Sequence, residues 1–340
     1  MQINIILDPR QSADELASLG ELAEANGIEG LLVSSLVQSR DPFANMTVLA
    51  KATQRLVFGP VAVNPWDTHP VRIAASLLTL NEFAAGRARI VIGGGAEALA
   101  ALGIKPHRRV RAVRECVEIM KLAMSGQAVE YAGELYQAHR LQFTWASAPP
   151  PPVYVGASMP MMLRMAARVA DGIMMSDMPV VLATEAIATL DAALASVDRS
   201  RDGFHTNMFS AIHLHQDRQV AVKEAKRWLV FRGIFRPNVL ALFLDADEVQ
   251  QVMTNEENFW AAFTAGSDHV EGVDDAVLDK LVEHVTLTGA ADDVEAIIAK
   301  LKAYAQVGLS HISLRLYADA DATIRLIGSK ILPALRDSAR

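Results

Sequence analysis

The sequence predicts a (β/α)8 barrel, an α/β fold in which parallel strands alternate with helices. Short apolar runs rich in β-branched residues alternate with longer segments of helical spacing. This alternation is typical of βαβ units around a parallel sheet. Eight such runs occur, with a helix-like segment in nearly every gap between them. The count favours a closed barrel, and an open doubly wound sheet is the alternative.

Each predicted strand is a short apolar run. The eight runs are residues 2–7, 30–33, 56–63, 89–92, 153–155, 172–175, 208–214 and 311–316. Runs of this length are consistent with strands that are buried on both faces of a parallel sheet.

The intervening helices are recognised by their apolar spacing and their ends. Residues 13–25 carry leucines at helical spacing and end near Gly27, a residue suited to a C-cap. His69 and Pro70 introduce residues 71–84, and proline suits a first helical turn. Further helices are predicted at 42–52, 108–124, 161–170, 183–195, 218–231, 291–305 and 323–335.

Two stretches depart from the alternation. Residues 127–143 contain Gly133 between alternating apolar residues, which predicts a β-hairpin insertion. Residues 240–285 predict an irregular helical insertion, whose acid-rich part, 245–275, is expected to be a solvated surface. We therefore expect one domain over residues 1–340 that carries these two insertions.

Composition and charge exclude several classes of protein. The chain is 51% apolar and 21% charged, as in ordinary globular proteins. Its formal charge of −7 and the lack of a basic stripe argue against a nucleic-acid partner. It has no apolar run of membrane length and no basic signal-peptide start, so we expect a cytoplasmic protein without a membrane partner. The single cysteine, Cys116, lies in an apolar helical pattern and is expected to be buried.

In an α/β barrel, function is located in the loops that follow the strands. The segment V-A-V-N-P-W-D-T-H-P follows the third strand, and its Pro65 restricts Asn64 to extended geometry. A bulge at Val63 and Asn64 would accept a flat ring, with Trp66 as a wall of the pocket. An ordinary proline-rich turn is the alternative.

The fourth strand is followed by Gly93, Gly94 and Gly95. Consecutive glycines allow close approach to the backbone and expose N–H groups, although a plain turn explains them equally well. They do not form the G-x-G-x-x-G dinucleotide fingerprint.

The loop after the fifth strand is the best candidate for holding an anion. Gly156, Ala157 and Ser158 lead directly into a helix, whose free N–H groups and dipole favour phosphate. A simple N-cap role for Ser158 is the alternative. Met175 and Ser176 end the neighbouring sixth strand and could complete the same cradle.

A metal centre is not expected. His213 and His215 alternate on a predicted strand and so share one face. However, no carboxylate or cysteine accompanies them at ligand spacing.

Taken in order, these segments resemble the bacterial luciferase-like superfamily. They look closest to its deazaflavin branch, the methylenetetrahydromethanopterin reductase-like proteins, and the resemblance covers nearly the whole chain. The matching segments are N-P-W-D-T-H-P, G-R-A-R-I-V-I-G-G-G, R-V-R-A-V-R-E-C-V-E-I-M, P-P-V-Y-V-G-A-S-M-P, A-D-G-I-M-M-S and L-T-G-A-A-D-D-V.

The resemblance implies a luciferase-like TIM barrel that binds coenzyme F420 or FMN. It places the ring on the bulge after the third strand and the phosphate near the fifth and sixth strands. It also implies a non-proline cis peptide near residues 62–64, a small-molecule substrate and a homodimer.

The chain departs from the family pattern at two places. Related proteins often have Asp-His where this chain has Ser35 and Leu36, and leucine cannot transfer a proton. Many relatives also have arginine where Thr68 stands, and an acid directly after the glycines, which here is displaced to Glu97. Ser35 and Glu97 are therefore the candidate catalytic residues, able to polarise or protonate a substrate.

These observations predict an oxidoreductase that transfers a hydride between coenzyme F420 and a small organic substrate. Such chemistry is supplied by the cofactor, while the protein orients the reactants and excludes water. An FMN-dependent monooxygenase and a non-catalytic cofactor-binding barrel are the alternatives. Basic side chains near the phosphate would favour F420, whose tail is an acidic oligoglutamate, and Arg108, Arg109 and Arg111 are candidates.

Overall fold

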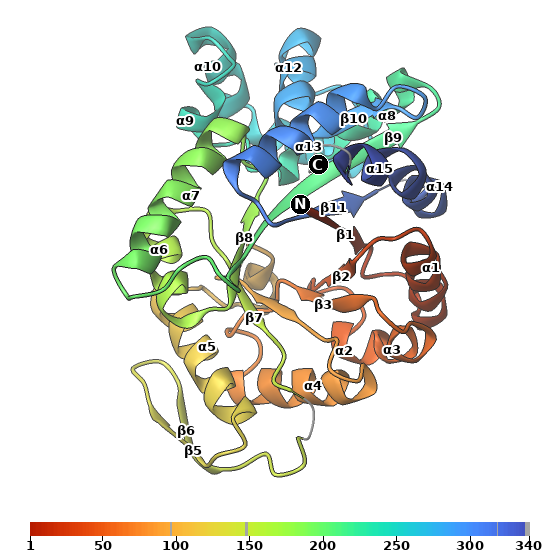
Figure 1. Ribbon diagram of the computed structural model, residues 1–340. Helices are drawn as coiled ribbons and strands as arrows, with labels where there is room; N and C mark the ends of the chain where they lie inside the picture. The colour runs from red at the N-terminus through yellow and green to blue at the C-terminus, as the bar shows by residue number, and fades with distance from the viewer. Residues whose placement is uncertain (96, 147–148, 318, 337–340) are drawn as a thin grey trace.

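The computed structural model describes residues 1–95, 97–146, 149–317 and 319–336, and its centre is a barrel of parallel strands (Figure 1). The barrel strands are β1 (Gln2–Leu7), β2 (Gly30–Ser34), β3 (Val57–Val61), β4 (Ile90–Ile92), β7 (Val153–Gly156), β8 (Gly172–Ser176), β9 (His205–His215) and β11 (His311–Leu316). They pair in the order β3-β2-β1-β11-β9-β8-β7-β4. Parallel bridges from Phe58 to Ala88 and from Val63 to Ile92 join the two ends of this order. The closed-barrel prediction is confirmed, because an open doubly wound sheet would lack this closure.

Helices surround the barrel on its outside (Figure 1). They are α1 (Ala13–Ala25), α2 (Pro42–Asn45), α3 (Thr47–Ala52), α4 (Pro70–Phe83), α5 (Arg109–Met124), α6 (Pro160–Val169), α7 (Val180–Ala195), α8 (Arg218–Arg227), α13 (Glu295–Val307), α14 (Ala320–Leu326) and α15 (Leu332–Arg336), with a π-helix (Ile327–Ile331) joining the last two. Apart from α8, their apolar faces pack against the outer face of the sheet in one large core cluster, which includes the buried Cys116.

The structure corrects several predicted boundaries. Residues 42–52 form two helices that meet at Met46, and the helix predicted for 218–231 ends at Arg227, before a 3-10 turn (Leu229–Phe231). The helix predicted from residue 291 begins at Glu295, because the preceding residues form strand β10 (Leu287–Ala290). Strand β10 pairs with the end of the long strand β9. Its four residues are too few to predict a strand from the sequence, and the distant partner β9 stabilises it.

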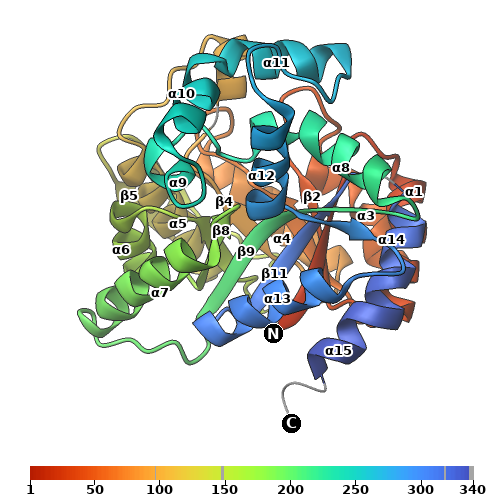
Figure 2. The same cartoon turned by 90° about the horizontal axis from the view of Figure 1, so that it is seen from above.

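Both departures from the alternation have the predicted type of structure. Residues 127–143 contain the antiparallel hairpin of β5 (Val129–Ala132) and β6 (Gln137–Leu141). Residues 240–285 contain α10 (Ala246–Thr254), α11 (Glu256–Ala265) and α12 (Asp275–Val285), and α9 (Pro237–Leu240) precedes them (Figure 2).

The expectation that 245–275 is simply a solvated surface is wrong. Val252, Phe259, Val270 and Val273 are buried in a second apolar cluster, formed together with α8 and α12. The helices are amphipathic, so their acidic faces dominate the composition while their apolar faces pack together.

The barrel interior is filled with side chains. Its middle contains apolar side chains from six strands: Ile6, Leu32, Val61, Val91, Tyr154 and Met174. Beside them, Asn4 and Asn207 both donate to the hydroxyl of Ser313, at 3.3 and 2.9 Å. None of the described helices is both long and apolar enough to cross a membrane.

Candidate functional site at the carboxyl end of the barrel

The bulge predicted after the third strand is present. The peptide bond between Val61 and Ala62 is cis, immediately before the predicted stretch 62–64. The carbonyl of Val63 then accepts a hydrogen bond from the N–H of Gly93 at 2.8 Å, which ties the bulge to the glycines after β4. The side chain of Asn64 is turned into its own loop, where its oxygen accepts from the N–H of Trp66 at 2.9 Å.

The glycines after β4 and β7 form a floor that is mostly backbone. A Cβ added to Gly93 would lie 3.0 Å from the Cβ of Ala62. A Cβ added to Gly156 would lie 3.8 Å from the Cα of Gly93. These residues are half-buried, and bulky side chains in their place would cover the surface that they share. We call Ala62, Gly93 and Gly156 the glycine floor.

The indole of Trp66 closes one side of this floor. Its Nε1 donates to the carbonyl of Gly94 at 3.3 Å, and its ring lies 5.0 Å from that of His107. A Cβ on Gly95 would lie 2.9 Å from the indole, and the backbone there has a φ of +78°, which favours glycine.

The two loops predicted to hold a phosphate lie side by side. The N–H of Ser176 donates to the hydroxyl of Ser158 at 3.3 Å, so the loops after β7 and β8 meet. The N-cap of α6 is Met159, without a side-chain hydrogen bond, so the alternative N-cap role of Ser158 is excluded. Ser158 comes directly before the start of α6, whose first N–H groups favour an anion, while the hydroxyl of Ser176 donates to the carboxylate of Asp177 at 3.1 Å.

Three predicted cofactor-binding side chains point away from this surface. Val63, Ala157 and Met175 are buried in the large core cluster outside the barrel. Strand alternation explains this, because neighbouring residues face opposite sides of the sheet. Only their backbone can contribute to the cradle.

Of the two candidate catalytic residues, the structure describes the side chain of Ser35 but not that of Glu97. Ser35 is half-buried at the end of β2, and its N–H donates to the carbonyl of Val61 at 2.8 Å, directly beside the bulge. Leu36, which follows it, is 58% exposed. Glu97 begins a short 3-10 helix (Glu97–Leu102), but its side chain lies outside the described part of the structure.

A buried charged network at the same end of the barrel was not predicted. Arg232 forms an ion pair with Asp177 at 3.2 Å and donates to the hydroxyl of Tyr317 at 2.7 Å. Burial raises the pKa of Asp177, and the guanidinium of Arg232 opposes this shift. The sequence placed Asp177 next to Ser176, but it could not show that Arg232, which follows the 3-10 turn after α8, would pair with it.

Two more side chains complete this network. Arg315 lies 3.6 Å from the carboxylate of Asp8, at the end of β1. The ring of His213 stacks on that of Tyr317 at 4.9 Å, and its Nδ1 lies 3.0 Å from Glu224. Burial lowers the pKa of His213, so the ring is neutral near pH 7. Within the described ranges, no group of three or more His, Cys, Asp or Glu side chains could hold a metal ion.

Comparison with known proteins gives a consistent result. Residues 2–311 match the model of the luciferase-like monooxygenase family. A 5,10-methylenetetrahydromethanopterin reductase of Archaeoglobus fulgidus is 29% identical, over 99% of this chain and 100% of that protein. An F420-dependent glucose-6-phosphate dehydrogenase of Nakamurella multipartita is 25% identical, over 95% of this chain and 92% of that protein.

Solved structures share the fold. The coenzyme F420-dependent tetrahydromethanopterin reductase from Methanopyrus kandleri superposes with a TM-score of 0.82 at 20% identity, covering 98% of both chains. An F420-dependent secondary alcohol dehydrogenase, solved with an F420-acetone adduct, has a TM-score of 0.79 at 17% identity, covering 99% of both chains.

Proposed function

This chain belongs to the luciferase-like monooxygenase family, and from that premise we propose that it is an F420-dependent oxidoreductase. It would transfer a hydride between the deazaflavin ring and a small organic substrate. The observation that carries this proposal is the glycine floor, where three residues without bulky side chains leave a flat backbone surface beside the bulge. The names of relatives that align over nearly the whole chain favour F420 as the cofactor.

The residues at the carboxyl end of the barrel fit this cofactor. Ala62, Gly93 and Gly156 would back the ring, while Ser158, Ser176 and the start of α6 would hold the phosphate. When bound, the deazaflavin supplies the hydride chemistry itself. The task of the protein is to orient the two reactants and to exclude water from between them.

We consider two residues as candidate proton donors, Ser35 and Glu97. Hydride transfer needs little acid–base chemistry from the protein, because the cofactor supplies the hydride. Ser35 contacts the bulge through its N–H, and its hydroxyl has no hydrogen-bond partner in the described ranges, so we propose that it polarises the substrate. Glu97 is the second candidate, on its sequence position alone. The proposal includes a cytoplasmic homodimer built from one domain over residues 1–340.

A titration of the purified protein tests the proposal. Oxidised F420 and, separately, FMN are added while cofactor fluorescence is followed. Saturable binding of F420 alone supports an F420-dependent oxidoreductase. Binding of FMN alone overturns it in favour of the monooxygenase, and binding of neither overturns it in favour of the non-catalytic barrel.

A further inference from the structure

Three arginines stand where α5 begins, next to the glycine floor. We call Arg108, Arg109 and Arg111 the arginine cluster. A Cβ added to Gly94 would lie 3.6 Å from the Cβ of Arg109 and 3.8 Å from the methyl of Met162, in α6. Arg109 therefore lies between the glycines after β4 and the helix that begins the phosphate cradle.

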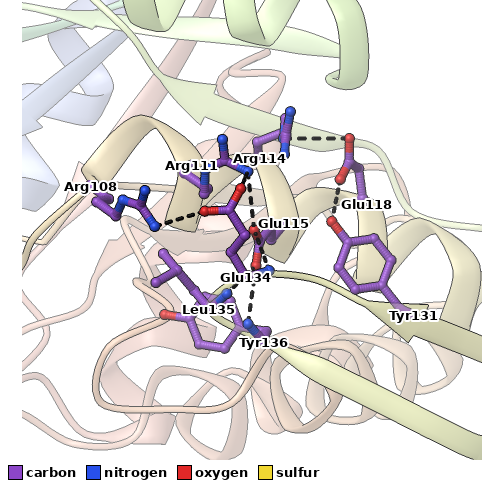
Figure 3. Close-up of polar contacts among 9 residues, drawn as sticks. All are labelled: Arg108, Arg111, Arg114, Glu115, Glu118, Tyr131, Glu134, Leu135 and Tyr136. Atoms are coloured by element: carbon purple, nitrogen blue, oxygen red, sulfur yellow. Dashed lines mark hydrogen bonds and ion pairs between the residues drawn. The ribbon is translucent and has the colours of Figure 1, made fainter.

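Within the described residues, the arginine cluster is not fully paired. Arg108 donates to the carboxylate of Glu134 at 2.7 Å, and Arg111 forms an ion pair with the same carboxylate (Figure 3). Arg109 is exposed and has no hydrogen bond or ion pair there. One carboxylate is thus shared by two guanidinium groups, while a third has none.

The carboxylate of Glu134 is accessible and replaceable. Its side chain is 48% exposed, so water screens its ion pairs with Arg108 and Arg111. The turn of the hairpin is held by Glu115, whose carboxylate also lies 3.9 Å from the guanidinium of Arg111. The buried carboxylate of Glu115 accepts from the N–H groups of Leu135 and Tyr136 at 2.9 and 3.0 Å (Figure 3).

The hairpin turn is also fixed to the carboxyl end of the barrel. The hydroxyl of Tyr136 donates to the carbonyl of Pro65 at 2.8 Å, in the loop that carries Trp66. The arginine cluster, the glycine floor and the loop after β3 therefore belong to one rim. This positive cluster occurs on a chain whose formal charge is −7.

We infer that the arginine cluster binds the acidic tail of the cofactor, a chain of glutamates linked to the phosphate. This inference rests on the proposed function. The tail carboxylates would replace Glu134 at Arg108 and Arg111 and would pair with Arg109. Guanidinium groups bind carboxylates through charge-assisted hydrogen bonds, and three of them on one rim match a ligand with several carboxylates. Glu134 occupies the cluster when the tail is absent.

The experiment compares two forms of the cofactor, F420 with its glutamates and the same deazaflavin with its phosphate but no glutamates. We expect the wild-type protein to bind the first about tenfold more tightly at low salt. Higher ionic strength should reduce this ratio, because exposed charge pairs are screened. The double substitution Arg108→Ala with Arg109→Ala should bring the ratio close to one while leaving the affinity for the tail-less form unchanged, and it spares Arg111, which also contacts the buried Glu115.

Two further variants separate tail binding from structural damage. Glu134→Gln removes the internal competitor and should raise the ratio by about two- to threefold, since one exposed ion pair is lost. Arg114→Ala is the matched control, because Arg114 lies on the same helix and faces Glu118 instead of Glu134. It should keep the wild-type ratio.

The outcomes distinguish this inference from the proposed function. A wild-type protein that binds both cofactor forms with equal affinity overturns the inference but keeps the proposed function. An unchanged ratio in the double arginine variant does the same. A wild-type protein that binds neither cofactor form contradicts both the inference and the proposed function.

Discussion

The two ends of the barrel treat buried charge in opposite ways. At the carboxyl end, Arg232 and Asp177 are paired at 3.2 Å, and both side chains are 3% exposed. At the amino end, the rings of His205 and His311 are tilted against each other with centres 4.9 Å apart, and the carboxylate of Glu29 lies 3.9 Å from His311. One end keeps its charges by pairing them, and the other keeps its histidines neutral.

This difference follows from where each partner comes from. His311 is the first residue of β11 and lies at the amino end, while Arg315 lies near the last residue and so at the carboxyl end. The two side chains share one face of the strand because they are an even number of residues apart. The carboxyl end also receives Arg232, from the segment that follows α8 in the chain, so its network depends on how that segment packs on the barrel. The carboxyl end, where the proposed function lies, is the end with the buried Arg232–Asp177 pair.

The largest expected effect is on stability at the carboxyl end. Arg232→Ala leaves the buried carboxylate of Asp177 without its partner, and removing one member of a buried pair typically costs about 3–5 kcal/mol. Denaturant unfolding measures this loss. Arg227→Ala, at an exposed arginine of the preceding helix, is the matched control and should change stability by less than about 0.5 kcal/mol. Equal effects of the two substitutions would show that the pair has no special role.

The next largest effect is on cofactor binding at the same end. Gly156→Leu covers the glycine floor and should lower cofactor affinity by about 100-fold, or about 2.7 kcal/mol. Gly156→Ala is the control, because its Cβ would sit at ordinary contact distances of 3.7–3.8 Å and project little further. Fluorescence titration measures both, and thermal melting verifies that the fold is intact. Unchanged affinity in the leucine variant would refute the placement of the cofactor.

The amino end should instead control the pH dependence of stability. Burial lowers the pKa of His205, and lowers that of His311 to about 3. Below about pH 6.5 the unfolded chain therefore binds more protons than the folded protein. The contribution of the two histidines to the free energy of unfolding is complete above that pH and is lost as the pH drops. The slope is at most about 1.4 kcal/mol per pH unit for each histidine. Glu29, whose pKa is raised by burial, opposes this trend.

The substitution His311→Gln tests that assignment. It removes one titrating group and should flatten the decline of unfolding free energy between pH 6.5 and pH 4, measured by denaturant titration at several pH values. The neighbouring Arg89 and His205 stay in place, so the difference from the wild-type protein isolates His311. Parallel curves for the two proteins would argue against a neutral, buried His311.

The smallest expected difference comes from a tyrosine at each end. Tyr136→Phe removes the hydrogen bond to Pro65 and should cost about 1 kcal/mol of stability. The hydroxyl of Tyr154, towards the amino end, has no hydrogen bond within the described ranges, so Tyr154→Phe should cost less than about 0.5 kcal/mol. Equal costs would mean that the hairpin contact contributes no more than packing.

Several parts of this molecule were predictable because their signals are local. The eight barrel strands and the hairpin each follow from residue types within about ten positions of one another, and Gly93 and Gly156 follow from the strands beside them. The position of Ser35 and Leu36 at the carboxyl end of the barrel was also predictable, because residues that follow a barrel strand lie at that end.

The sequence by itself determined the barrel, the order of its loops and the backbone segments on which a flat ring could rest. Only the tertiary structure decided that Arg232 meets Asp177, 55 residues apart in the chain, that β10 joins β9, and that Glu134 lies against Arg108. The physical reason is that periodicity and turn chemistry act within neighbouring residues. Which distant side chains become partners depends on how the barrel closes and how the insertion packs on it, and neither leaves a local pattern.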